Sequence, residues 1–137
     1  MTYVLDTNVL SEWRKPVPNA GVVEWFEAVG PSRLFLSVIT VGEIRRGIAK
    51  LELRGEYRKA AAIESWLAST KELFVDRLVP ITVAIAEEWG GYGARAQVPT
   101  ADGLIAATAR VYGWTVVTRN VKDFEPTGAR LLNPFAH

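Results

Sequence analysis

The sequence predicts an α/β fold, namely a three-layer α/β/α sandwich with a mainly parallel central sheet. Strand-like segments alternate along the 137 residues with segments that repeat apolar residues at helical spacing. The strand-like segments are continuous apolar runs, which is typical of parallel strands with helices on both faces. The sequence contains no internal repeat, low-complexity segment or linker, so we expect one domain over residues 1–137.

The first part of the chain is expected to hold two strands and two helices. A short buried strand at 2–5 is followed by a helix at 9–14, which two prolines close. Asn19 is the expected N-cap of the next helix, which runs to Val29 before a Gly-Pro pair breaks it. Residues 33–37 then form a second buried strand.

Two longer helices are expected in the middle of the chain. Residues 39–53 carry an apolar stripe at helical spacing, and residues 56–76 carry another after the break at Gly55. The region between residues 47 and 76 has the weakest ties to the sheet. We therefore expect it to project as an arm or to serve as an interface.

The remaining third is expected to complete the sheet. A short extended segment at 78–81 precedes helices at 82–97 and 99–112, the second of which ends at a glycine. Residues 114–118 form a clear strand, and residues 129–132 form the last one.

The composition excludes several kinds of chemistry. The chain has no cysteine, which rules out thiolate sites, and its one histidine is the terminal His137, a position that argues against a histidine base. No apolar run reaches the ~18 residues that cross a bilayer, and the N-terminus has no signal-peptide pattern, so the cytoplasm is the expected compartment. The net charge of +1 does not by itself predict nucleic-acid binding. Acid–base chemistry would have to come from carboxylates, lysine, tyrosine or water activated by a metal.

Four acidic residues stand at places where a metal ligand is plausible: Asp6, Glu43, Asp102 and Asp123. Asp6 and Asp123 follow strands, and the carboxyl ends of parallel strands meet at one edge of a sheet. Asp102 lies in the first turn of its helix, and Glu43 lies about one turn into its own. Each has an ordinary alternative: Asp6 as a helix cap, Asp102 as a partner of the helix dipole, Glu43 as a solvated helix residue and Asp123 as a loop aspartate. Together they form a set of hard oxygen ligands that suits Mg²⁺ or Mn²⁺.

Four sequence runs around these acids resemble the PIN-domain ribonucleases, and among them the VapC/FitB-like toxins of type II toxin–antitoxin pairs. The runs are YVLDTNVLSE, SVITVGEIRRGI, PTADGLIAATA and VVTRNVKDFE, in this order. The resemblance implies a PIN-like sandwich and a metal-dependent endoribonuclease site. It places the family's acidic quartet on the four acids above and its polar positions on Thr7, Asn8, Thr118 and Asn120.

The resemblance also implies roles for these residues. Asp6 and Asp102 would hold Mg²⁺ or Mn²⁺, while Glu43 and Asp123 would complete the site, directly or through water, and help to hold a second ion. Thr118 and Asn120 would orient Asp123 or a water. The attacking water would be activated by the metal, which removes the need for a histidine.

The expected partners are an RNA substrate and a cognate antitoxin. Six basic residues near the motifs are candidate RNA contacts, although each alone is better explained as a solvated surface charge: Arg14, Lys15, Arg45, Arg46, Arg119 and Lys122. An antitoxin would bury its C-terminal segment along the helices and place a basic residue among the acids. The resemblance further implies a homodimer and a hetero-oligomer with the antitoxin on operator DNA, with no membrane association.

Two other functions fit the same residues. The chain could be an antitoxin-binding co-repressor partner with negligible turnover. It could also be an aspartyl-phosphate enzyme with Asp6 as the nucleophile, although that chemistry commonly requires a second acid two residues later, where this chain has Asn8.

Overall fold

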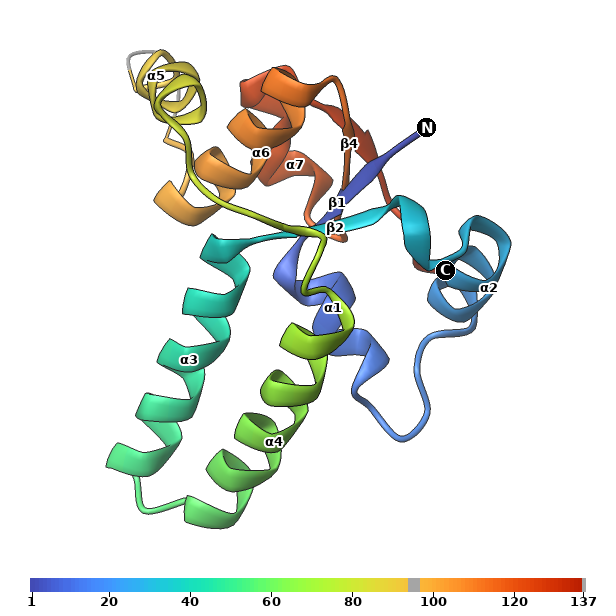
Figure 1. The fold of residues 1–137 in the computed structure, drawn as a ribbon, viewed down its shortest axis with the longest axis vertical. Helices are drawn as coiled ribbons and strands as arrows, with labels where there is room; N and C mark the ends of the chain where they lie inside the picture. Colours follow the sequence, from blue (N-terminus) through green and yellow to red (C-terminus); the bar gives the residue numbers. More distant parts are fainter. Residues whose placement is uncertain (94–96, 137) are drawn as a thin grey trace.

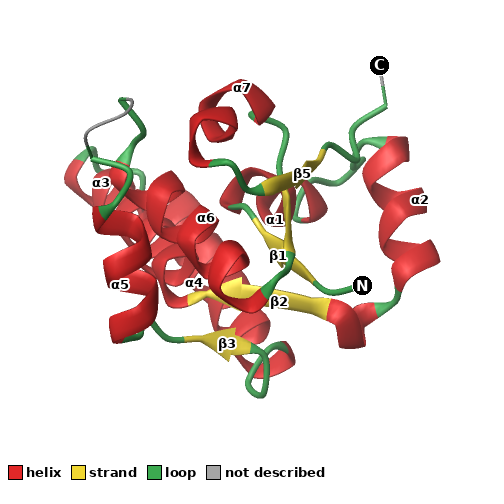
Figure 2. Ribbon diagram, turned by 90° about the horizontal axis from the view of Figure 1, so that it is seen from above, coloured by secondary structure: helices red, strands yellow, loops and turns green. Residues whose placement is uncertain are grey.

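The computed structural model describes residues 1–93 and 97–136, and within them a parallel sheet forms the centre of the molecule. All pairs of neighbouring strands are parallel, in the order β3-β2-β1-β4-β5. The strands are β1 (Tyr3–Leu5), β2 (Leu34–Ser37), β3 (Leu78–Val79), β4 (Thr115–Val117) and β5 (Arg130–Leu132). Figure 2 shows β1 and β2 among the helices and β3 at the lower edge of the molecule. The predicted parallel sheet is confirmed.

Helices cover both faces of this sheet, which confirms the three layers. In β1, Tyr3 and Leu5 belong to one buried apolar cluster, whereas Val4 between them belongs to another. The first cluster contains residues of the helices before β3, and the second contains residues of those after it. The helices are α1 (Thr7–Trp13), α2 (Ala20–Val29), α3 (Val38–Leu53), α4 (Tyr57–Leu73), α5 (Val83–Gly90), α6 (Thr100–Tyr112) and α7 (Val121–Phe124).

The helices α3 and α4 project together from the sheet, as Figure 1 shows in its lower half. Ile48 of α3 and Leu67 of α4 are buried in the first apolar cluster, and Arg45 and Glu64 form an ion pair of 2.8 Å across the two helices. The expected arm is therefore present.

Several expectations about the helices were wrong. The first helix begins at Thr7 rather than at residue 9, because the Asp6 side chain caps it there. The helix predicted at 82–97 ends at Gly90, because Gly90, Gly91 and Gly93 have a low helix propensity, and positions 94–96 lie outside the described residues. The helix predicted at 56–76 ends at Leu73. Asp123 was expected in a loop, yet it lies in α7, whose four residues are too few to show a helical period.

The strand ends lead directly into helices, and this arrangement positions the acids. Asp6 follows β1, its backbone N–H donates to the Val117 carbonyl of β4, and its side chain caps α1 by accepting from the Thr7 N–H. Ser37 at the end of β2 caps α3 in the same way through the Ile39 N–H. Among the described residues, no helix is both long and apolar enough to span a membrane.

Candidate active site

Asp6 lies at the centre of the candidate site. Asp6 is only 4% exposed, and both of its carboxylate oxygens accept hydrogen bonds. The Thr7 N–H donates to Oδ1 at 2.8 Å, while the Thr118 hydroxyl and the Asn8 amide donate to Oδ2 at 2.8 and 3.1 Å. Burial raises the pKa of Asp6, the three hydrogen bonds lower it, and Glu43 raises it further.

Glu43 is held in the site by Thr7, the residue that follows Asp6 in the sequence. The Thr7 hydroxyl donates to Glu43 Oε1 at 2.6 Å, which joins the start of α1 to α3. The Thr40 hydroxyl lies 3.4 Å from that of Thr7. Glu43 therefore points into the site, and the alternative of a fully solvated helix residue does not describe it.

The loop after β4 is tied to the same carboxylate. Thr118 is fully buried, its hydroxyl donates to Asp6, and that hydroxyl also accepts from the Asn120 backbone N–H at 3.0 Å. The side-chain oxygen of Asn8 accepts from the Arg119 N–H at 3.2 Å. Thr118 thus orients Asp6 rather than Asp123, and the observed hydrogen bond of Asn120 in this network comes from its backbone.

Asp102 faces the other three acids. Its pKa is raised to about 6, first by partial burial and then by the negative charges of Asp6, Glu43 and Asp123. A helix N-terminus favours an ionised carboxylate, whereas the burial of Asp102 and the neighbouring negative charges favour its protonated form. The structure therefore brings the four predicted acids to one region, including Asp102, which the position of its helix in the sequence did not place there.

In the part of the chain that the structure describes, no lysine or arginine forms an ion pair with these four acids. In the same residues, no three side chains of His, Cys, Asp or Glu lie close enough to hold one ion. An all-oxygen donor set nevertheless fits Mg²⁺ or Mn²⁺, since Mg²⁺ is usually held by one or two carboxylates and keeps several waters. Asp6 and Asp102 have the burial and the unpaired charge to hold it.

The six candidate RNA contacts differ in how they are engaged. Lys15 forms an ion pair of 2.8 Å with Glu12, and Arg45 forms one with Glu64. The Arg14 guanidinium lies 5.8 Å from the Trp66 ring centre, beside a cavity of about 220 Å³ that also includes Thr7 and Glu43 in its lining. Two of the others, Arg119 and Lys122, line an open concavity of about 330 Å³ together with Asn120, Val121 and Asp123. Arg46 is exposed on α3.

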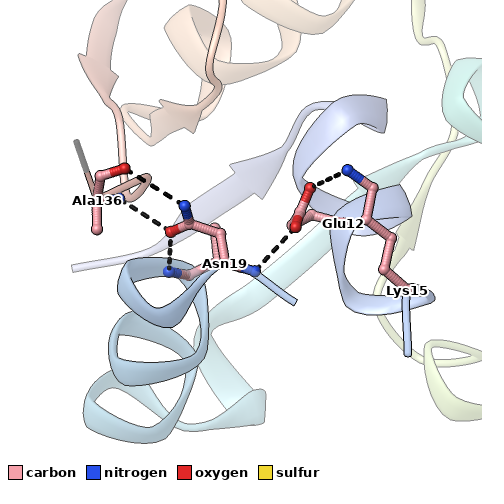
Figure 3. A network of polar contacts seen from close by, with 5 residues as sticks. Glu12, Lys15, Asn19 and Ala136 are labelled. Carbon is pink, nitrogen blue, oxygen red and sulfur yellow. Dashed lines mark hydrogen bonds and ion pairs between the residues drawn. The ribbon is translucent and has the colours of Figure 1, made fainter. Parts of the chain in front are cut away.

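Two polar residues near the site escaped the sequence analysis. Thr40 lies one turn before Glu43, and its only signal was a polar residue in the first turn after a strand. Glu12 is buried, accepts from the Asn19 N–H at 2.8 Å and binds Lys15, as Figure 3 shows. The Lys15 ammonium, followed by the Asn19 N–H, lowers the pKa of Glu12. Its signal was its place three residues after Val9 on the buried side of α1.

Comparisons with known proteins connect this arrangement to a family. The family model described as "PIN domain" matches residues 3–128. The chain is 36% identical to "Toxin FitB" of Neisseria gonorrhoeae, and the match covers 96% of this chain and 97% of that protein. It is 33% identical to "VapC ribonuclease Y4jK" of Sinorhizobium fredii, over 96% of each chain.

A solved structure agrees with the sequence matches. The chain resembles the crystal structure of FitAcB from Neisseria gonorrhoeae with a TM-score of 0.84 and 35% identity, over 97% of this chain and 98% of that one. It also resembles the structure of FitAB bound to an IR36 DNA fragment, with a TM-score of 0.79 and 30% identity, over 99% and 97% of the two chains.

Proposed function

We propose that this chain, which belongs to the PIN domain family and within it to the VapC/FitB-like group, is the toxin of a toxin–antitoxin pair and a metal-dependent endoribonuclease. The observation that carries the proposal is the set of four acids, none of which forms an ion pair with a lysine or arginine within residues 1–93 and 97–136. The negative charges of Asp6, Glu43 and Asp123 all raise the pKa of Asp102. The ribonuclease named among the similar proteins supports the same reaction.

The proposed cofactor is Mg²⁺ or Mn²⁺, held by Asp6 and Asp102 and, directly or through water, by Glu43 and Asp123. When bound, such an ion supplies positive charge that acidifies a water and stabilises phosphate oxygens. Asp6 is kept in position by three donors, and a carboxylate has lone pairs left for a further partner. Thr7 fixes the orientation of Glu43.

These residues perform the positioning that phosphodiester hydrolysis requires. Thr118 and Asn8 hold Asp6 against rotation, so little ordering is needed when substrate arrives. Asp102 is ionised above a pH of about 6 and then adds a second negative charge beside Asp6. The RNA backbone would bind next to this pair through basic residues at the rim of the site.

The proposed protein partner is an antitoxin. An apolar cavity of about 320 Å³ lies between α1, α2 and α4, and Trp13, Phe26, Trp66 and Leu73 are among its lining residues. Trp66 also lines the smaller cavity that contains Thr7, Arg14 and Glu43. An apolar antitoxin segment seated in the first cavity would extend through the second, and a basic residue at its end would neutralise the acids.

Assembly follows from the same comparison. The similar FitAcB and FitAB structures are toxin–antitoxin complexes, and the second is bound to DNA. We therefore propose a toxin dimer that joins its antitoxin on operator DNA in the cytoplasm. A co-repressor role without turnover predicts the same complexes, so RNA cleavage by the isolated chain distinguishes the two functions.

An aspartyl-phosphate mechanism fits the structure poorly. That chemistry commonly requires a second acid two residues after the nucleophile, but Asn8 stands there and its amide donates to Asp6 Oδ2 at 3.1 Å.

The experiment is RNA cleavage by the purified chain with Mg²⁺, with Mn²⁺ and with EDTA. Asp6→Asn and Asp102→Asn should each abolish metal-dependent cleavage while the chain stays folded by circular dichroism. The matched control is Asp76→Asn, because the Asp76 side chain is 79% exposed and lies outside the acidic set. Cleavage by Asp6→Asn at the parent rate would contradict the proposal, and no cleavage by the parent would favour the co-repressor role.

A further inference from the structure

We propose that Arg119 binds a phosphate of the RNA strand beside Asp123, and that Phe135, near the C-terminus, is the positioning residue that holds the Arg119 guanidinium there. This inference rests on the proposed ribonuclease function and adds a specific substrate contact to it. It also gives the last turn of the chain a role in that contact.

The backbone of Arg119 adjoins the acidic set, while its guanidinium is near enough to Glu12 to help lower the pKa of that carboxyl. Its backbone N–H donates to Asn8, and the preceding residue, Thr118, donates to Asp6. The residue is exposed. Among the described residues, its guanidinium takes part in no ion pair and no side-chain hydrogen bond. Its planar set of donors, which matches a phosphate, therefore stays available.

Phe135 fixes where that guanidinium lies. The Arg119 Cζ lies 4.7 Å from the centre of the Phe135 ring, a cation–π distance. The ring is 8% exposed and belongs to the same buried cluster as Val9 and Leu10, so it cannot turn away. Stacking on a fixed ring lowers the number of rotamers that the arginine must give up when it binds.

The segment that carries Phe135 is itself anchored. The Asn19 side chain accepts from the Ala136 N–H at 2.9 Å and donates to its carbonyl at 3.3 Å, as Figure 3 shows. The Asn133 side chain accepts from the Phe135 N–H at 3.0 Å. The segment passes so close to Gly21 that a Cβ there would lie 2.5 Å from the Ala136 nitrogen. Residues 133–136, called the C-terminal turn below, are thus held against the start of α2.

The space beside Arg119 suits a phosphodiester. The open concavity of about 330 Å³ has the cations Arg119 and Lys122 and the carboxylate of Asp123 in its lining. The charge of Asp123 also raises the pKa of Asp102, which connects the concavity electrostatically to the acidic set. A phosphate bound to Arg119 would therefore lie next to the proposed metal site, and a neighbouring phosphodiester of the RNA strand would reach that site.

The test measures binding of a fluorescent single-stranded RNA to the full chain by anisotropy, in the Asp6→Asn background so that the RNA stays intact. Arg119→Ala should weaken binding about tenfold, and the slope of log Kd against log salt should fall by about 0.7. Arg119→Lys should recover only part of the affinity, because an ammonium does not stack as a planar guanidinium does. Arg58→Ala, an exposed arginine on α4, is the matched control and should change Kd by less than twofold.

Phe135 is tested by a double-mutant cycle. In the same Asp6→Asn background, Phe135→Leu should weaken binding about threefold when Arg119 is present. It should have no further effect when Arg119 is replaced by alanine. Phe135→Tyr keeps the ring and should bind RNA as tightly as the chain with Phe135. In cleavage assays with otherwise unmodified enzyme, the same variants should raise KM more than they lower kcat. A purely structural role of Phe135 would give equal losses with and without Arg119.

The outcomes separate this inference from the function on which it rests. RNA cleavage by the parent together with an unchanged Kd in Arg119→Ala overturns the Arg119 contact and leaves the proposed function in place. Equal effects of Phe135→Leu in both backgrounds overturn the positioning role. A parent that neither binds nor cuts RNA refutes the proposed function, and the inference falls with it.

Discussion

The Thr118 hydroxyl donates a hydrogen bond of 2.8 Å to Asp6 Oδ2, although the two residues are 112 positions apart in the chain. Both side chains are buried, and the same hydroxyl accepts from the Asn120 N–H. One hydroxyl therefore joins the loop after β1 to the loop after β4 and holds the central carboxylate of the site.

Thr118→Val keeps the shape of this side chain and removes the hydroxyl. We expect a loss of about 1–3 kcal/mol in the free energy of unfolding, because a buried carboxylate loses a donor and the Asn120 N–H loses an acceptor. RNA cleavage should fall as well. Urea denaturation and initial rates check both effects, and Thr118→Ser should preserve most of each. A fully active and stable Thr118→Val variant would show that Asp6 does not depend on this contact.

Thr7→Val removes the 2.6 Å hydrogen bond to Glu43. Without it, the Glu43 side chain is free to turn towards solvent, so metal affinity should fall while the fold remains. Titration of Mn²⁺ by calorimetry measures the change, with Thr7→Ser as the conservative control. Equal affinities of the parent and Thr7→Val would mean that Glu43 needs no orientation by Thr7.

Asp102→Asn should stabilise the chain in EDTA at pH 7.5. The folded pKa of Asp102 is raised from 3.8 to about 6, so the folded state binds more protons than the unfolded state between these values. The stability of the parent must therefore fall as pH rises through this window, and the variant escapes this loss. Denaturant unfolding at pH 4, 6 and 7.5 should show an advantage of the variant that grows with pH. An advantage that is constant from pH 4 to 7.5 would contradict the assigned cause.

Gly21→Ala should displace the C-terminal turn. The new Cβ would lie 2.5 Å from both the Ala136 nitrogen and the Pro134 oxygen, which are backbone atoms and cannot move without the segment. We expect a cost of about 1–3 kcal/mol in the free energy of unfolding. Gly42→Ala is the matched control, because nothing lies within 4 Å of a Cβ there and alanine favours a helix. Equal stability of the two variants would show that the turn is not held against α2.

The sequence was sufficient to predict the layers and the parallel sheet, because strands that are buried on both faces consist of continuous apolar runs. It also indicated Asp6 as a residue at the carboxyl edge of the sheet, since that position follows directly from the strand it ends. The cap of α2 by Asn19 was predicted for the same local reason.

Contacts between segments that lie far apart in the chain could not be predicted from the sequence. The bond between Thr7 and Glu43 depends on how α3 crosses α1, and no local pattern contains that relation. The stacking of Arg119 on Phe135 depends on where the chain returns after β5. Asp102 could not be placed because its helix follows a glycine-containing segment rather than a strand.

The most direct test of the central claim is anomalous X-ray scattering from crystals of the chain soaked in MnCl₂. The account predicts a manganese peak about 2 Å from a carboxylate oxygen of Asp6 or Asp102, with Glu43 and Asp123 facing it. The peak should be lost in Asp6→Asn crystals. A fully soaked crystal with no peak among these four side chains, or with manganese only at other acids, would contradict the account.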